Sequence, residues 1–323
     1  MAHAVRFASP GGPDVLSFET VDVGDPGPGE VRLRQTVCGL NFIDVYHRTG
    51  LYPVPLPSGI GLEAAAVVVA VGEGVTDLSE GDRVAYGAGP IGAYATERLM
   101  PADRLVKLPD AIDDETAAAM MLKGMTAEYL IRRTFTVTAG MPVLFHAAAG
   151  GVGLIAGQWL KHIGAIPIGT VGSLEKAELA RAHGYDHTIL YNEENIAERV
   201  RDITDGAGVP VVYDSVGKDT FAASIDCLAP RGMFVSFGNA SGPVPPFEPG
   251  MLAQKGSLYF TRPTLMTYVA SRSDLVDSTN ALFAAVQAGV KIEINQRVAL
   301  KDAAQAHRDL EARKTTGSTI LLP

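Results

Sequence analysis

The order of apolar and polar positions divides the chain into two parts with different periodicity. In the first third, short apolar runs alternate with Gly and Pro, a pattern typical of strands joined by tight turns. The clearest of these runs are Val31–Val37, Ala65–Val71 and Arg83–Tyr86. The segment Glu115–Thr134 is then expected to be a helix, with Asp113 or Asp114 as its N-cap. The pattern predicts a β-rich domain.

From Pro142 onward, short apolar runs alternate with segments of helical periodicity. The predicted strands are Pro142–His146, Ile166–Val171, His187–Tyr191, Val209–Asp214 and Gly232–Gly238. The predicted helices are Leu154–Ile163, Leu174–His183, Glu193–Thr204 and Thr220–Leu228. This alternation indicates βαβ units and a parallel sheet. The expected fold class is therefore α/β, with a Rossmann-type parallel-sheet domain beside a β-rich domain.

The last sixty residues are expected to complete the first domain. Helices are predicted at Ser273–Ala288 and Asp302–Arg313, and the apolar run Ser318–Leu322 is predicted to be a strand that returns to the β-rich domain. The expected division is one domain of residues 1–124 and 264–323 and a second domain of residues 125–263.

Bulk properties narrow the class of protein. The chain has 323 residues, 47% hydrophobic residues and a net charge of −9, which argues against a dedicated nucleic-acid-binding protein. Cys38 and Cys227 fit neither a disulfide framework nor a metal-ligand spacing. No signal-peptide pattern begins the chain, and no apolar run approaches the roughly 20 residues of a membrane span. A cytoplasmic protein that does not enter the membrane is expected.

A glycine-rich turn, Ala147–Gly153, separates the first predicted strand of the parallel sheet from a helix. The free N–H groups of a first helical turn, together with the helix dipole, bind the pyrophosphate of a dinucleotide. Gly150 and Gly151 allow close approach of the cofactor, Val152 follows them in the turn, and Gly153 lets the helix lie near the strand. Ala148 departs from the strict G-x-G-x-x-G spacing, and a tight turn without a ligand is the alternative.

The end of the next predicted strand indicates which nicotinamide cofactor binds. NAD sites place an Asp or Glu there, but this chain has Thr170-Val171-Gly172-Ser173. Ser173 and Lys176 are able to donate to a 2′-phosphate, and Tyr191, at the end of the following strand, is placed to reach the same group. The alternative for Lys176 is a solvated residue on a surface helix. The sequence therefore predicts NADPH as the cofactor.

Several motifs resemble one family. Pro57–Glu63, Gly81-Asp82-Arg83-Val84 and Ala147–Gly153, in this order, resemble the medium-chain dehydrogenase/reductase superfamily. Further motifs are similar to NADPH:quinone oxidoreductases of the zeta-crystallin-like branch, and they run almost end to end. These motifs are Asn41–Tyr46, Arg48–Pro53, Lys123–Thr126, Val212–Gly217, Ser236–Asn239 and Thr261-Arg262-Pro263. The resemblance implies a β-rich GroES-like catalytic domain beside the Rossmann domain.

Zinc-dependent relatives carry a Cys near the position of Asn41 and a His at the position of Leu62, in a G-H-E motif, and they also have a four-Cys structural loop. This chain lacks that set of thiolate and imidazole ligands, so no metal is expected. The resemblance then implies NADPH-dependent reduction of a quinone, by net single electrons to a semiquinone. The alternatives are reduction of an enone or alkenal double bond, and a non-catalytic NADPH-binding role as a crystallin or an RNA-binding protein.

Tyr46 is the first candidate for the acceptor site, with Asn41 and Asp44 beside it, because a tyrosine can stack on a ring or bond a carbonyl. The alternative for Tyr46 is a structural aromatic on a helix. Cys38 is expected to be a small buried residue and His146 a satisfied core histidine. Further expected cofactor contacts lie mostly where strands of a parallel sheet end. They are Phe42, Thr126, Ser215, Phe237, Gly238, Asn239, Phe260, Thr261, Arg262 and Arg313.

The predicted strand Ser257–Thr261 falls at the edge of the parallel sheet. Edge strands pair readily with a copy of themselves, so a homodimer with a continuous sheet is expected. The other expected partner is a small-molecule quinone.

Overall fold

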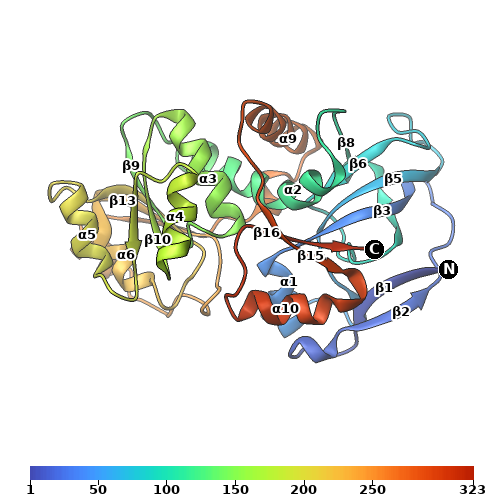
Figure 1. Cartoon of the computed structure of the whole chain (residues 1–323), viewed down its shortest axis with the longest axis horizontal. Coiled ribbons are helices and arrows are strands. Elements are labelled where there is room, and N and C mark those ends of the chain that lie inside the picture. The colour runs from blue at the N-terminus through green and yellow to red at the C-terminus, as the bar shows by residue number, and fades with distance from the viewer. The chain divides into compact units, whose positions relative to one another are not determined.

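The computed structural model describes residues 1–323, and the chain separates into two compact units (Figure 1). The first unit comprises Met1–Met125, Tyr268–Gln287 and Ile292–Pro323, and the second comprises Thr126–Thr267 and Ala288–Lys291. Helix α2 (Asp114–Tyr129) runs from one unit into the other. No helix combines the length and apolar character that crossing a membrane would require.

The first unit is built on two sheets. The smaller sheet has the order β2-β1-β4, and the larger has the order β15-β16-β3-β5-β6-β8, with β7 also paired to β3. The strands of the smaller sheet are β1 (Ala2–Phe7), β2 (Ser17–Val21) and β4 (Ser58–Gly59). Those of the larger sheet are β3 (Glu30–Leu40), β5 (Glu63–Val71), β6 (Arg83–Tyr86), β7 (Glu97–Pro101), β8 (Val106–Lys107), β15 (Ile294–Ala299) and β16 (Ser318–Leu322).

Strand β16 brings the end of the chain back to the first unit, as predicted. It pairs antiparallel with β3, with Thr319 opposite Leu40, and parallel with β15. The helices of this unit, besides the first part of α2 and short 3₁₀ turns, are α1 (Phe42–Thr49), α9 (Arg272–Gln287) and α10 (Ala303–Glu311). The sequence pattern does not predict β1, β2, β4, β7, β8 or β15, which are short strands without a continuous apolar run.

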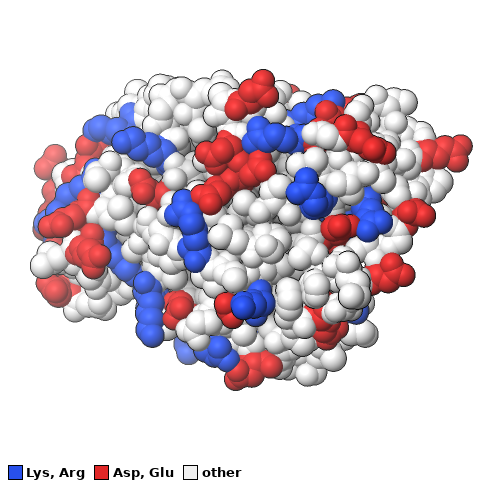
Figure 2. All heavy atoms as spheres, turned by 45° about the vertical axis from the view of Figure 1, so that its right-hand side comes forward, with Lys and Arg blue, Asp and Glu red and all other residues white.

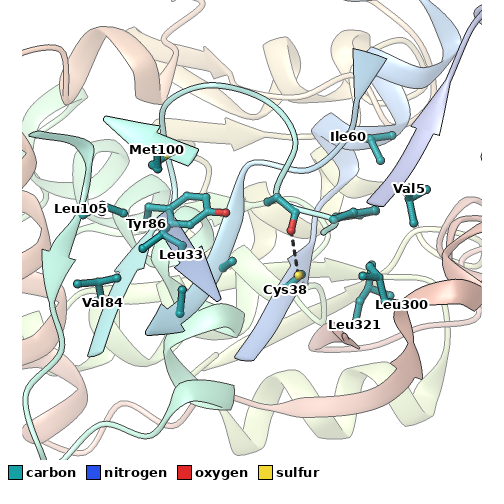
Figure 3. Packing of buried hydrophobic residues seen from close by; sticks show 14 of the residues in the cluster. Val5, Leu33, Cys38, Ile60, Val84, Tyr86, Met100, Leu105, Leu300 and Leu321 are labelled. Atoms are coloured by element: carbon teal, nitrogen blue, oxygen red, sulfur yellow. Dashed lines mark hydrogen bonds between the residues drawn. The ribbon is translucent and has the colours of Figure 1, made fainter. Parts of the chain in front are cut away.

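The core of the first unit lies around β3, β5 and β6 and includes residues from the end of the chain (Figure 3). Cys38 is fully buried there, and its thiol donates to the carbonyl of Ala93 at 2.9 Å, as expected for a small core residue. Burial also raises the pKa of the Cys38 thiol to about 12. Members of this core from distant parts of the sequence are Val5, Leu33, Ile60, Val84, Tyr86, Met100, Leu105, Leu300 and Leu321.

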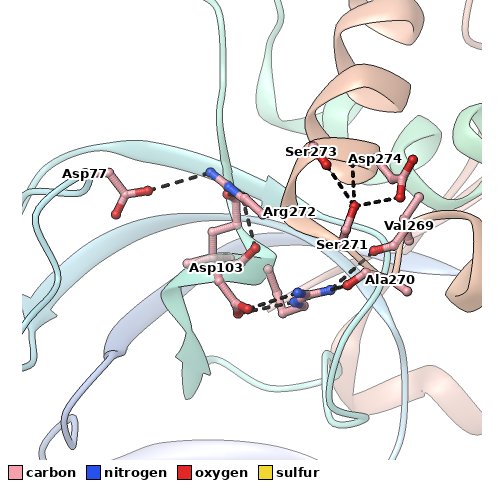
Figure 4. A network of polar contacts seen from close by, with 10 residues as sticks. Asp77, Asp103, Val269, Ala270, Ser271, Arg272, Ser273 and Asp274 are labelled. Atoms are coloured by element: carbon pink, nitrogen blue, oxygen red, sulfur yellow. Dashed lines mark hydrogen bonds and ion pairs between the residues drawn. The ribbon is translucent and has the colours of Figure 1, made fainter.

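A polar network fixes the start of α9 within the first unit (Figure 4). Arg272 donates to the carbonyl of Leu105 at 2.5 Å and forms an ion pair with Asp77 at 3.7 Å. Arg104, held by Asp103 at 2.9 Å, donates to the carbonyl of Val269 at 3.3 Å. These bonds attach a late helix to a loop of the β-rich fold.

The second unit is the parallel-sheet domain that the sequence predicts. Its six strands have the order β11-β10-β9-β12-β13-β14, and every neighbouring pair is parallel. The strands are β9 (Pro142–Phe145), β10 (Ile166–Val171), β11 (His187–Leu190), β12 (Val209–Asp214), β13 (Leu228–Ser236) and β14 (Tyr259–Thr261). The helices are α3 (Gly151–Ile163), α4 (Leu174–Ala182), α5 (Ile196–Ile203), α6 (Phe221–Cys227), α7 (Gly250–Gln254) and α8 (Leu265–Tyr268), whose last residue belongs to the first unit.

Two predicted helix boundaries differ from the structure. The expected helix Glu115–Thr134 is α-helical only as far as Tyr129 and continues as a π-helical turn, Leu130–Thr134. Asp113 caps its start, because its carboxylate accepts from the backbone N–H of Thr116 at 2.7 Å. Helix α3 begins at Gly151 rather than at Leu154. The sequence predicts the later start because glycine is a poor helix former, but in the structure Gly151 and Gly153 lie in the first turn of the helix.

Candidate functional site

The candidate cofactor residues of the second unit gather at one edge of its sheet. Strand order reverses at β9, which has β10 on one side and β12 on the other. In such sheets the ligand crevice lies outside the carboxyl ends of the strands at this reversal. The predicted residues that follow the ends of these strands are Gly150–Gly153, Gly172, Ser173, Tyr191, Ser215, Phe237, Gly238, Asn239 and Arg262, while Phe260 and Thr261 lie within β14.

The turn between β9 and α3 has the geometry of an anion site. Its N-cap, Gly150, provides no side-chain hydrogen bond, so the first-turn N–H groups of α3 are not capped by a side chain. A Cβ on Gly153 would lie 2.5 Å from the carbonyl oxygen of Ala147, so only glycine lets the helix approach this turn. Ala147 itself has a positive φ of 55°. These features fit a dinucleotide pyrophosphate.

The residues expected at the 2′-phosphate lie together after β10 and β11. A Cβ on Gly172 would be 2.5 Å from the Tyr191 hydroxyl oxygen, which shows that the Tyr191 ring packs against this glycine. Asn192 donates to the Gly172 carbonyl at 3.0 Å. Ser173 caps α4 by accepting from the backbone N–H of Lys176 at 3.3 Å. The Ser173 hydroxyl and the Lys176 ammonium, on the first turn of α4, are donors, and neither Gly172 nor Ser173 directly after β10 is an acid, which suits an anionic group.

Close packing also joins the ends of β12 and β13. A Cβ on Gly238 would be 2.5 Å from the carbonyl oxygen of Ser215, and the N–H of Phe237 donates to the carbonyl of Asp214 at 2.8 Å. The buried carboxylate of Asp214 accepts from the N–H groups of Val216 and Gly217 at 2.7 and 2.9 Å. This network fixes the backbone beside Ser215, where the sequence analysis expected a cofactor contact.

His146 belongs to the core of the second unit, as expected. Its two ring nitrogens bond the hydroxyls of Thr170 and Ser224, each at 2.9 Å, and the side chain is fully buried. Burial lowers the pKa of His146 below its ordinary value. The ring is therefore neutral and held in place by two hydroxyl partners.

Helix α1 of the first unit carries the candidate acceptor residues. Asn41 is its N-cap, and its backbone N–H donates to Asp44 Oδ2 at 2.9 Å. The ring of Tyr46 lies 5.5 Å from that of Phe42 and 5.1 Å from that of Tyr52, so the three rings form one aromatic cluster. Tyr46 is 7% exposed, so most of its ring is covered by other residues of the chain.

Asp44 ends a chain of directed hydrogen bonds that the sequence analysis did not foresee. Arg48, an obligate donor, lies 3.0 Å from His307 Nδ1, so the neutral ring carries its proton on Nε2. His307 Nε2 lies 3.4 Å from the Tyr94 hydroxyl, which donates to Asp44 Oδ2 at 2.9 Å. Asp44 Oδ1 is buried without a hydrogen-bond partner. Burial raises the pKa of Asp44 to about 7 and lowers that of His307 to about 3.

A second buried cluster contains a complete ion pair. Glu63 Oε2 accepts from Lys123 Nζ at 2.8 Å and from Asn41 Nδ2 at 2.7 Å, and Glu63 Oε1 accepts from the N–H of Leu122 at 2.7 Å. The Glu63 side chain is fully buried and that of Lys123 is 7% exposed. Asn41, a predicted site residue, is thus held by a charge pair that the sequence analysis did not assign to the site.

The sequence does contain a local signal that Glu63 and Lys123 are buried charges. Lys123 follows the apolar run Ala117–Leu122, and Glu63 precedes the apolar strand residues Ala64–Val71. A single charge within or beside a long apolar run indicates a buried charge, which requires a partner. The sequence alone does not show that these two charged residues, sixty positions apart, form an ion pair with each other.

Two further predicted cofactor residues are Arg313 and Thr126. Arg313 is exposed in the first unit just after α10, with a φ of 56°. Thr126 is 7% exposed at the start of the second unit, within α2. No three His, Cys, Asp or Glu side chains come together in an arrangement that holds a metal ion.

Comparisons with known proteins agree with this architecture. Residues 27–110 match the model of the alcohol dehydrogenase GroES-like domain, and residues 151–277 match the model called zinc-binding dehydrogenase. The chain is 56% identical to a protein named quinone oxidoreductase from Pseudomonas aeruginosa over 325 residues, covering all of both chains. It is 49% identical to 2-haloacrylate reductase from a Burkholderia species, covering 100% of this chain and 99% of that protein.

A solved structure shows the same fold. The crystal structure of Escherichia coli quinone oxidoreductase complexed with NADPH superposes with a TM-score of 0.98 at 48% identity, covering 99% of this chain and all of that one. The likeness spans both units, including the motifs that carry the resemblance in the sequence. The chain therefore belongs to the quinone oxidoreductase family of the medium-chain dehydrogenase/reductase superfamily.

Proposed function

We propose that this protein uses NADPH to reduce quinones. The observation that carries the proposal is the anion site at the start of α3 together with the acid-free loop where Gly172 packs against Tyr191. The relative from Escherichia coli is described as a complex with NADPH, and two bacterial relatives of similar length are named quinone oxidoreductases. When bound, NADPH supplies the reducing equivalents.

The residues of the chain have distinct roles in this proposal. The first-turn N–H groups of α3 bind the pyrophosphate, and Ser173, Lys176 and Tyr191 bind the 2′-phosphate. The backbone at Phe237–Asn239 and Phe260–Arg262 supports the nicotinamide end, with Phe42, Thr126, Ser215 and Arg313 as further cofactor contacts. Tyr46 and its aromatic neighbours stack on the acceptor ring, while Asn41 and Asp44 line its polar end. Reduction is proposed to proceed without a metal.

The test is NADPH oxidation with a panel of ortho- and para-quinones and of enones. Turnover with quinones at rates well above those with enones supports the proposal. Preferential turnover of enones or alkenals favours double-bond reduction instead, an alternative supported by the 2-haloacrylate reductase relative. Tight NADPH binding without turnover of any acceptor would indicate the non-catalytic role. Electron paramagnetic resonance during turnover tests the proposed one-electron route, which requires a semiquinone signal.

A nucleic-acid role has less support. The net charge is −9, and on the face shown in Figure 2 basic and acidic side chains are interspersed. Specific RNA binding by the full chain would require clustered Lys and Arg.

Both cysteines are free and buried, which supports a reducing compartment such as the cytoplasm.

We also propose a homodimer formed through β14. This strand is the outermost of the six-stranded sheet, and Tyr259 on it is 59% exposed. An exposed edge strand offers unpaired backbone groups to a second copy. Light scattering at micromolar concentration tests this, with twice the mass of the chain expected for the natural sequence and the monomer mass for a Tyr259→Pro variant. A monomer mass for the natural sequence would contradict it.

A further inference from the structure

The Glu63–Lys123 pair has donor capacity that the protein does not use. An ammonium group has three N–H donors, and Glu63 Oε2 is the acceptor that the structure provides to Lys123. The Asn41 amide has two N–H donors, of which one bonds the same oxygen. Both oxygens of Glu63 are already engaged. The remaining N–H donors of Lys123 and Asn41 are therefore available to another acceptor atom.

The position of this donor pair is informative. Glu63, next to Leu62, accepts from both Asn41 and Lys123 through its Oε2 atom, so the amide and the ammonium lie beside the same carboxylate oxygen. The ammonium group thus supplies a buried positive charge beside Asn41, which is a predicted acceptor-site residue. An ammonium that is 7% exposed, with one acceptor for three donors, interacts strongly with a negative charge because little water screens it.

We propose that Lys123, together with the Asn41 amide, binds the carbonyl oxygen of the acceptor and stabilises the negative charge that forms on it during reduction. This inference rests on the proposed function. In the two-electron form of the reaction, a hydride passes to the quinone, both carbonyl π bonds are lost as the ring becomes aromatic, and the resulting hydroquinone monoanion takes one proton from solvent and leaves as the neutral hydroquinone. NADPH is oxidised to NADP⁺, and the quinone gains two electrons and two protons in total.

Within this site the other groups have supporting roles. Glu63 is a positioning residue, because it holds the ammonium and the amide on one side of a single carboxylate oxygen. Asp44 belongs to the capping box of α1, and its Oδ2 atom accepts from the backbone N–H of Asn41 and from the hydroxyl of Tyr94. The proposal therefore limits the acceptor to compounds with a conjugated carbonyl oxygen, a group that quinones and enones share.

The double substitution Glu63→Gln with Lys123→Met tests the proposal, because it removes both charges and leaves no unpaired buried ion. Lys107→Met is the matched control, since Lys107 is an exposed lysine of the same unit, paired with Asp82. The probe is 4-nitrophenol, which is not reduced by NADPH and whose phenolate form absorbs visible light. Binding is followed as its absorbance is titrated against pH in the presence of NADP⁺.

In the natural protein and in the control, we expect the bound probe to ionise about 1–3 pH units lower than the free probe, as beside an opposite charge. The double variant should lose this shift, and its kcat with quinones should fall roughly 100-fold, as when one oxyanion donor is removed. Its NADPH affinity should stay unchanged.

An equal ionisation shift in the double variant would overturn the inference. Weaker NADPH binding with an unchanged shift would also overturn it, because Lys123 would then contact the cofactor. The proposed function and the proposed role of Lys123 and Asn41 are contradicted by different results. A natural protein that shifts the probe but reduces no quinone contradicts the proposed function and retains the donor pair, whereas normal quinone turnover without the shift contradicts the donor pair alone.

Discussion

The hydroxyl of Tyr94 donates to Asp44 Oδ2 at 2.9 Å, and neither side chain is exposed to solvent. Tyr94 also lies 3.4 Å from His307, whose other ring nitrogen meets Arg48. The donors run in one direction, from Arg48 through His307 and Tyr94 to Asp44. An acid and a base, both far from their ordinary pKa values, are thereby joined in one buried network.

Asp44 should make the stability of the protein fall as pH rises. Burial, the largest effect, raises its pKa from 3.8 to about 7. Between about pH 4 and about pH 7 the folded state keeps a proton that the unfolded state has lost, so this contribution to stability, complete at low pH, disappears through that window. Asp44→Asn should remove this slope in urea-unfolding measurements. An unchanged slope would show that Asp44 ionises normally.

His307 should have the opposite effect. Burial, followed by the charge of Arg48, lowers its pKa from 6.5 to about 3. As pH falls from about 6.5 toward about 3, the unfolded state gains a proton that the folded state excludes, so stability is lost with acid. In His307→Gln the loss of stability on acidification should be smaller than in the natural protein. A steeper loss would contradict the assignment, and His187→Gln, at an exposed position, is the control.

Removing one member of the Glu63–Lys123 pair should lower the free energy of unfolding more than replacing both members. Lys123→Met leaves the Glu63 carboxylate buried without its counter-ion, which typically costs about 3–5 kcal/mol of unfolding free energy. Adding Glu63→Gln should recover most of that loss, because an amide needs no counter-ion. Chemical unfolding of the two single variants and the double variant checks this as a cycle. Additive losses would show that the two side chains do not interact.

Gly153→Ala should weaken NADPH binding strongly. The new Cβ would lie 2.5 and 2.6 Å from the carbonyl oxygens of Ala147 and Ala148, so the first turn of α3 would have to move. Gly250→Ala is the matched control in the same unit, since a Cβ there has open space. Fluorescence titration with NADPH measures both. Equal affinity in the two variants would show that the approach of α3 to the turn does not determine binding.

Lys176→Ala should weaken the binding of NADPH but not of NADH. Losing a hydrogen bond to a charged group costs about 1.5–3 kcal/mol, or roughly 10- to 150-fold in affinity. Lys255→Ala is the control, because this exposed lysine of the second unit pairs with Asp226. Titrations with both cofactors check the ratio of their affinities. A parallel loss for NADH would mean that Lys176 does not bind the 2′-phosphate.

Elements with strong local patterns could be predicted from the sequence. Strands β10 and β12 match their expected bounds because apolar β-branched runs between turn residues determine them locally. The glycine-rich turn could also be predicted from a local pattern, because its glycines lie between a predicted strand and a predicted helix. Strand β15 was missed, because exposed and partly buried residues alternate along it without an apolar run, and its place depends on β16.

Some residues of the candidate site could likewise be predicted from the sequence, whereas others could not. Residues that follow strand ends, such as Gly172 and Tyr191, could be placed together from sheet topology alone. The Asp44–Tyr94–His307 network could not, because its members come from distant segments and hydrogen bonding between them depends on side-chain geometry. The pairing of Glu63 with Lys123 likewise depends on tertiary contact.

Strand β16 pairs with β3 across almost the whole length of the chain, with Leu321 opposite Cys38. On the ribosome, the second unit is therefore synthesised in full before the sheet of the first unit can close. Until then β3 lacks one of its neighbours and exposes part of the edge of a buried, apolar strand, which is prone to aggregation. Nascent chains stalled before residue 318 should consequently need a chaperone for the unit that was translated first.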